Sequence, residues 1–222
     1  MESFLGAALG ALPAIFFWIV VALAAAHYLA AHLRVPILLP RVPYRALAKC
    51  TAIFYPAYAT LLTFGQYFVW SSDWWGKQFL NTSLAPSLPI PLIQLFPNFF
   101  GSRLGYFLFY SWGRFWLHAL LAVGVAALFW WFLRMLKRRN ERFFEEGETE
   151  LGFLCALAAG WPGILPFLVL AFLLVLAVSI ARRAIFGEAF TTLGLPFLIA
   201  AVAALAFGGA LASFFGVSAL AV

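Results

Sequence analysis

The chain has 222 residues, of which 65% are apolar and 10% are charged, whereas soluble globular domains are roughly half apolar and about a quarter charged. A water-soluble fold of this length could not bury so much apolar surface, so the composition predicts a membrane protein. The net charge of +6 does not indicate nucleic-acid binding, because the basic residues cluster in short segments between apolar ones. Cys50 and Cys155 each stand alone and suggest neither a disulfide framework nor a zinc site.

Apolar segments that are long enough to cross a bilayer recur along the chain. In chain order they cover approximately residues 4–33, 50–70, 115–133, 164–181 and 189–213. A shorter apolar stretch, 151–160, is followed by Trp161-Pro162-Gly163, which is typical of a turn. The sequence therefore predicts an all-α polytopic integral membrane protein. We expect a single membrane domain over residues 1–222, with about six transmembrane helices, one of them short.

The basic residues predict the topology, because cytoplasmic loops of membrane proteins are enriched in Lys and Arg. With six helices, eleven of the fourteen Lys and Arg fall on one side, in segments 34–49, 134–142 and 182–183. This distribution predicts a multi-pass protein of the inner (cytoplasmic) membrane with both termini outside. Residues 71–105 then form an outer interfacial connection that either lies on the membrane surface or re-enters it. Residues 134–150 form a cytoplasmic loop, first basic and then acidic.

Residues 145–150 hold four of the eight acidic residues of the chain. Carboxylates at a membrane boundary are costly unless they are paired or have a function. Two interpretations remain open. The acids either balance the neighbouring basic run and favour the start of a helix, where Glu148 and Glu150 would lie, or they serve proton transfer, cation binding or peptide hydrolysis.

Three short motifs follow one another in the last third of the chain. They are Gly-Glu-Thr-Glu-Leu at 147–151, a Gly-Trp end at 156–161 and Gly-Leu-Pro-Phe at 194–197. Spread over about residues 129–208, they resemble the prepilin peptidases, membrane aspartyl proteases whose signature is roughly Gly-x-Gly-Asp-x-Lys-Leu. The resemblance implies motif positions at Gly147, Leu151, Gly194 and Pro196. It implies catalytic positions at Glu148 and Glu150.

The chain departs from the family at the acids themselves. Glu148 stands where the family has aspartate, and Glu150 stands where it has lysine. Such proteases need two aspartates that share a proton, and the single aspartate, Asp73, is expected at the outer end of its helix. The sequence therefore predicts a proteolytically inactive relative that acts as a scaffold or binds a leader peptide or another membrane subunit. A small membrane transporter, or a membrane subunit of a larger complex, is the alternative.

Arg114 and His118 lie one helical turn apart near the predicted outer end of the third span. They either bind an anionic lipid headgroup or substrate, or extend to the interface as charged side chains commonly do. The other histidines, His27 and His32, point in different directions on a helix, and no cysteine or carboxylate completes a metal set with them. We expect no metal, cofactor or nucleic acid, and the lipid bilayer as the surrounding partner.

Overall fold

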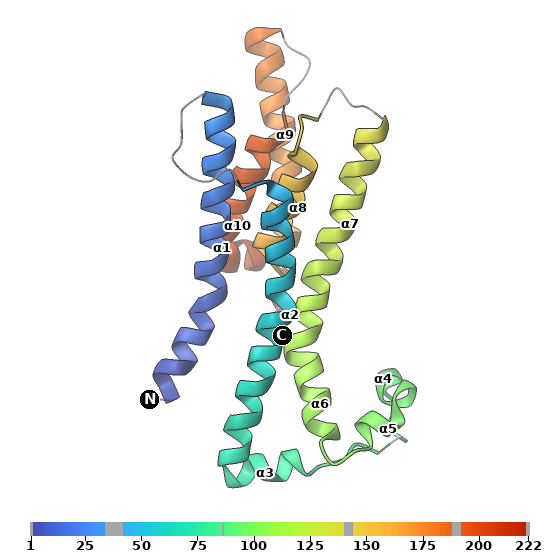
Figure 1. The fold of residues 1–222 in the computed structure, drawn as a ribbon. Coiled ribbons are helices and arrows are strands. Elements are labelled where there is room, and N and C mark those ends of the chain that lie inside the picture. The colour runs from blue at the N-terminus through green and yellow to red at the C-terminus, as the bar shows by residue number, and fades with distance from the viewer. Residues whose placement is uncertain (1, 34–41, 86, 140–143, 188–191, 221–222) are drawn as a thin grey trace. The chain divides into compact units, whose positions relative to one another are not determined.

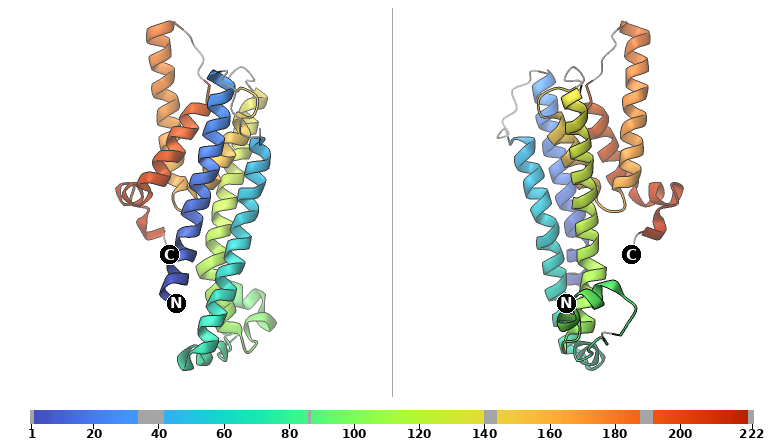
Figure 2. Two further views of the ribbon diagram at one scale, coloured as in Figure 1. Left: turned by 60° about the vertical axis from the view of Figure 1, so that its left-hand side comes forward. Right: turned by 90° about the vertical axis from the view of Figure 1, so that its right-hand side faces the viewer.

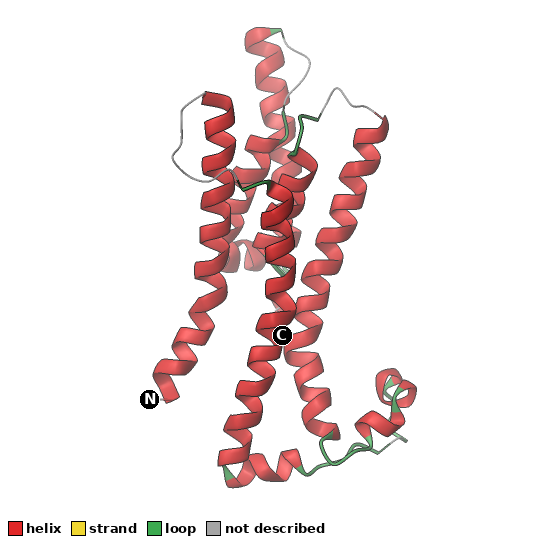
Figure 3. Cartoon of the chain, in the orientation of Figure 1, coloured by secondary structure: helices red, strands yellow, loops and turns green. Residues whose placement is uncertain are grey.

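The structure is a computed structural model that describes residues 2–33, 42–85, 87–139, 144–187 and 192–220. Within these ranges the chain is helical and contains no strand, as the sequence predicted (Figures 1 and 3). The chain divides into two compact units. Unit 1 comprises residues 1–53 and 122–222, and unit 2 comprises residues 54–121. The expectation of a single membrane domain stays a prediction.

Unit 1 is organised around a short central helix (Figure 2). Its helices are α1 (Glu2–Leu33), the first part of α2 (Tyr44–Ser72), most of α7 (Leu117–Arg139), α8 (Glu148–Ala159), α9 (Ile164–Phe186) and α10 (Gly194–Phe214). Helix α8 contacts α1, α9 and α10, and nine of its 12 residues are buried. Gly152 permits this packing, because a Cβ there would lie 2.7 Å from Leu133 Cδ1 and 2.9 Å from Phe197 Cε2.

The short helix that the sequence predicted before Trp161 is confirmed as α8. Its 12 residues correspond to about 18 Å at 1.5 Å per residue, well below the hydrocarbon thickness of about 30 Å. Helix α8 ends at Gly160, whose φ of 63° is in the left-handed region that favours glycine. Residues 161–163 then form the predicted turn before α9 begins.

Four helical segments are long and apolar enough to cross a membrane by their length and composition. They are Leu9–His32, Gly105–Arg139, Ile164–Ile185 and Gly194–Phe214. Large apolar side chains on them are exposed, for example Ile19 at 53%, Leu128 at 67% and Ile180 at 60%, which suits contact with lipid. The predicted number of about six spans is not confirmed. Helix α8 is too short, and α2, although 29 residues long, is not among the four.

The structure of the basic residues 134–139 corrects one prediction. The sequence analysis placed them in a loop over residues 134–150, but α7 continues through Arg139. No Gly or Pro interrupts residues 134–139, Lys and Arg are good helix formers, and positive charge is favourable at a helix carboxyl end. Residues 140–143 lie outside the described ranges, and residues 144–147 lead into α8 without helical structure.

Unit 2 holds the connection that the sequence placed between two spans. Beyond the rest of α2 it contains α3 (Trp74–Leu80), α4 (Pro91–Leu95), α5 (Pro97–Phe100), α6 (Gly105–Ser111) and a π-helical turn (Trp112–Trp116). Asp73 caps α3, since its carboxylate accepts a hydrogen bond from the Gly76 N–H at 3.3 Å. The ring of Trp70 stacks on that of Tyr106 with the centroids 6.2 Å apart. Whether residues 71–105 lie on the membrane surface or re-enter it stays a prediction.

Candidate functional site

The first turn of α8 carries most of the residues that the sequence singled out. Gly147 precedes it with a φ of 86°, a left-handed conformation that favours glycine. A Cβ there would also lie 3.0 Å from Cδ2 of the Tyr44 ring in α2. Glycine at this position therefore lets the chain turn into α8 while it packs against the start of α2.

Glu148, the first residue of α8, is 3% exposed. Its Oε1 accepts a hydrogen bond from the backbone N–H of Gly194 at 2.7 Å, and its Oε2 accepts one from the N–H of Glu145 at 3.0 Å. Gly194 is the first residue of α10, so its N–H is one of those that a helix leaves without an internal partner. The carboxylate of Glu148 therefore ties the start of α10 to the turn before α8.

Burial raises the pKa of the Glu148 carboxyl above its ordinary value of 4.5. The hydrogen bonds from the backbone act in the opposite direction, because they favour the charged form. The negative charge of Glu145 again raises the pKa. Each oxygen of this carboxylate has a backbone donor, and the group has little contact with solvent. These are the surroundings of a structural carboxylate.

Gly194 and Pro196, the two motif residues at the start of α10, are both buried. A Cβ on Gly194 would lie 2.3 Å from Cε2 of Tyr28 in α1, so glycine allows α1 to approach α10. Pro196 lies in the first turn of α10, where its missing N–H leaves no helical hydrogen bond unmade. In this structure both residues serve the contact between helices.

A histidine approaches the acidic stretch from α1. The Nε2 of His32 lies 3.1 Å from Oε2 of Glu145, and its Nδ1 lies 2.9 Å from the backbone oxygen of Tyr28. Both partners are oxygen atoms that can accept a hydrogen bond from a ring N–H. The ring of His32 also stacks on that of Tyr28, with centroids 4.0 Å apart.

The sequence analysis missed this pairing, because it considered His32 only as a possible metal ligand. The signal that could have found it was the topology. Charge distribution placed the carboxyl end of the first span and residues 145–150 on the same side of the membrane. That placement made His32 a candidate neighbour of the acids, but the pairing itself depends on how α1 packs against α8.

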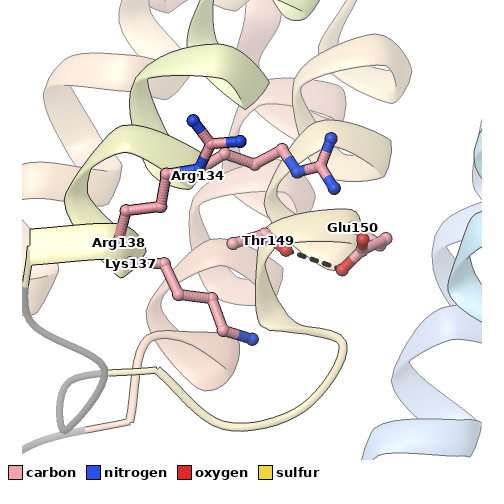
Figure 4. Close-up of a pocket in the computed structure, with 5 residues that line it drawn as sticks. All are labelled: Arg134, Lys137, Arg138, Thr149 and Glu150. Carbon is pink, nitrogen blue, oxygen red and sulfur yellow. Dashed lines mark hydrogen bonds between the residues drawn. The ribbon is translucent and has the colours of Figure 1, made fainter.

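Glu150 and Thr149 face a different region from Glu148. They line a cavity of about 250 Å³ together with Arg134, Lys137 and Arg138 from the end of α7 (Figure 4). Oε2 of Glu150 accepts a hydrogen bond from the Thr149 hydroxyl at 2.6 Å. The two acids that match the family motif therefore have different surroundings. Leu151, the last residue of the motif, is fully buried and packs in the core.

Arg114 and His118 lie in unit 2, inside the helical segment that begins at Gly105 and not near its start. Arg114 is exposed and falls in the π-helical turn. The Nδ1 of His118 is buried and has no hydrogen-bond partner in the described part of unit 2. The contact of these two residues with an anion or lipid stays a prediction.

Asp73, the only aspartate in the sequence, caps α3 in unit 2. Glu188, another acid that could have approached Glu148, lies outside the described residues. Among the residues that the structure describes, no group of three or more His, Cys, Asp or Glu could hold a metal ion. No family model, curated protein or solved structure matches the chain. The likeness to prepilin peptidases therefore rests on the sequence motifs alone.

Proposed function

We propose that this chain is an integral membrane scaffold, a divergent relative of the prepilin peptidases that binds a partner but does not cleave peptides. The observation that carries the proposal is the state of the Glu148 carboxylate. It stands at the family's catalytic position, yet it is 3% exposed and both of its oxygens accept hydrogen bonds from backbone N–H groups.

Aspartyl proteolysis places different demands on a carboxylate. One acid must activate a water molecule while a second, close to it, donates a proton to the substrate carbonyl. A catalytic water molecule would need access to Glu148, which is only 3% exposed. The group that reaches this acidic turn from α1 is the imidazole of His32, which cannot supply the second carboxyl group.

The same arrangement suits a scaffold. Glu148 joins α8 to α10, Gly152 brings α8 against α7 and α10, and Gly194 brings α10 against α1. Glu148, which matches a catalytic position of the family, and the motif residue Gly194 thus serve contacts between helices, and Gly152 adds a further contact. The partner that this scaffold binds is, on our proposal, a leader peptide or another membrane subunit in the cytoplasmic membrane.

The topology that accompanies this proposal has both termini outside and the basic segments in the cytoplasm. Reporter fusions after residues 139, 163 and 187 test it. A cytoplasmic reporter is expected to be active after residues 139 and 187, and a reporter of the outer side after residue 163. The opposite pattern would reject this orientation.

A cleavage assay tests the functional proposal. Full-length protein in detergent is incubated with a peptide that carries a prepilin-type leader, and both binding and hydrolysis are followed. We expect binding or no interaction, with no cleavage above that of the Glu148→Gln variant. Hydrolysis that the wild-type chain performs and Glu148→Gln abolishes would refute the scaffold and restore a protease.

A further inference from the structure

The cavity between the end of α7 and the start of α8 has a lining with an excess of positive charge. Three of its five lining residues are basic, namely Arg134, Lys137 and Arg138. Lys137 and Arg138 follow Arg134 by three and four positions, so each of them lies beside Arg134 on the surface of α7. Like charges at these spacings repel one another by a few tenths of a kcal/mol per pair, and an anion among them would remove that repulsion.

The acid in the lining does not neutralise these cations. In the described part of the chain no basic nitrogen lies within 4.0 Å of a Glu150 oxygen. Glu150 accepts instead from the Thr149 hydroxyl at 2.6 Å. The guanidinium of Arg134 lies over the Trp130 ring, 4.4 Å from its centroid. Among the residues that the structure describes, no carboxylate therefore forms an ion pair with these three basic side chains.

The enrichment of Lys and Arg on the cytoplasmic side of membrane proteins explains why α7 ends in basic residues. It does not explain which of these residues line a cavity. Arg139 belongs to the same run and is exposed, yet it is not part of the lining. In Figure 4 the basic side chains of α7 lie opposite Thr149 and Glu150 of α8. The cavity thus has a cationic side and a side with a carboxylate.

The position of the cavity indicates what could enter it. It lies at the end of a 35-residue apolar helical segment, Gly105–Arg139, where a membrane-spanning helix meets the lipid headgroups. Arginine binds phosphate oxygens through two parallel N–H bonds, and basic pockets between membrane helices are suited to phospholipid headgroups. A volume of about 250 Å³ can take a phosphate with a small substituent but not a large soluble ligand.

We propose that this cavity binds the phosphodiester headgroup of a membrane phospholipid. The phosphate lies against Arg134, Lys137 and Arg138, and Glu150 accepts a hydrogen bond from the headgroup substituent. A carboxylate retains acceptor capacity after it has bonded to one hydroxyl. The site therefore favours ethanolamine or glycerol, which carry N–H or O–H donors, over choline, which has none.

Native mass spectrometry of the detergent-purified full-length chain tests this proposal. The probes are phosphatidylglycerol, phosphatidylethanolamine, phosphatidylcholine and inorganic phosphate, each titrated separately. We expect phosphatidylglycerol and phosphatidylethanolamine to be retained more strongly than phosphatidylcholine. Arg138→Gln is expected to weaken that retention by about fivefold, the effect of one basic residue at a membrane surface. Lys137→Gln provides a second variant in case Arg138→Gln does not fold.

Arg139→Gln is the matched control, because it removes the same charge from the neighbouring position outside the cavity. It is expected to leave lipid retention unchanged. Equal losses for Arg138→Gln and Arg139→Gln would show attraction by surface charge alone and would overturn the proposal. Glu150→Leu, which removes the hydrogen-bond acceptor, is expected to retain phosphatidylglycerol but to lose the discrimination against phosphatidylcholine.

The titration with inorganic phosphate distinguishes a lipid headgroup from a soluble ligand as the source of the phosphate group. Retention of lipid that millimolar phosphate does not displace supports a membrane headgroup. A different outcome is that the chain binds inorganic phosphate, that Arg138→Gln weakens this binding, and that no lipid is retained. The cavity would then be a phosphate site whose ligand is soluble. No retention of either probe would overturn the site.

Discussion

Glu148 and Glu150 lie two positions apart in the first turn of α8, and their carboxylates have opposite surroundings. Glu148 is buried, and each of its oxygens accepts a hydrogen bond from a backbone N–H. Glu150 is partly exposed, accepts from one side-chain hydroxyl and lines an open cavity. Two chemically identical groups on one helix turn thus have different contacts, because one faces α10 and the other faces the end of α7.

The largest change in the free energy of unfolding is expected when Glu148 is truncated, and truncation of Glu150 provides the comparison. Glu148→Ala leaves the N–H groups of Gly194 and Glu145 without this acceptor. The bond from Gly194 is buried, and an unpaired buried donor costs about 1–3 kcal/mol. Glu150→Ala removes a bond to one neighbouring hydroxyl and should change stability by about 0.5 kcal/mol or less, as partly exposed positions usually do. Thermal unfolding of both variants in the same detergent checks this difference. Equal losses would show that the two carboxylates are not distinct in role.

The next effect concerns the close approach of α1 to α10. Gly194→Ala places a methyl group where the Tyr28 ring lies 2.3 Å away, and overpacking of this kind costs about 1–3 kcal/mol. Gly208→Ala in the same helix is the control, because a Cβ there meets nothing within 4 Å. It should be close to neutral, because a methyl group there meets no obstruction. Partial rescue of Gly194→Ala by Tyr28→Leu would confirm the cause of the loss.

The buried acid also predicts a dependence on pH. Because burial raises the pKa of Glu148 in the folded state, the folded chain holds this proton more tightly than the unfolded chain does. The contribution of Glu148 to the free energy of unfolding is then greatest below its ordinary pKa of 4.5, and it falls as the pH rises through the raised value. Unfolding midpoints of wild type and Glu148→Gln, measured across acidic and neutral pH, report this difference. A constant difference across that range would contradict the prediction.

The smallest change in the free energy of unfolding is expected for the contact between His32 and Glu145. The side chains of His32 and Glu145 are 37% and 49% exposed, and ion pairs of this kind contribute about 0.2–1 kcal/mol. A double-mutant cycle with His32→Gln and Glu145→Gln should give a coupling within that range. The same cycle with the exposed Glu146 in place of Glu145 should give no coupling energy. A coupling to Glu146 as large as that to Glu145 would show general charge attraction without a specific contact.

The fold class could be predicted from the sequence, because a long apolar segment in lipid has few alternatives to a helix. The brevity of α8 and the turn after it were equally evident, since Gly160 and Pro162 interrupt the helical pattern locally. The end of α7 was less evident. The charged residues 134–139 suggested a loop, although Lys and Arg extend a helix well where no Gly or Pro intervenes.

The sequence by itself therefore determined the helical class, four apolar segments that are long enough to span a membrane and the position of the acidic turn before a short helix. The resemblance named Gly147, Gly194 and Pro196 only as motif positions, and the structure showed the backbone conformation of Gly147 and the close helix contact at Gly194. The tertiary structure decided which partner each charged side chain has. The pairing of Glu148 with the N–H of Gly194 joins residues 46 positions apart, and that of His32 with Glu145 joins residues 113 apart. Helical periodicity repeats every few residues and carries no information on such distant contacts.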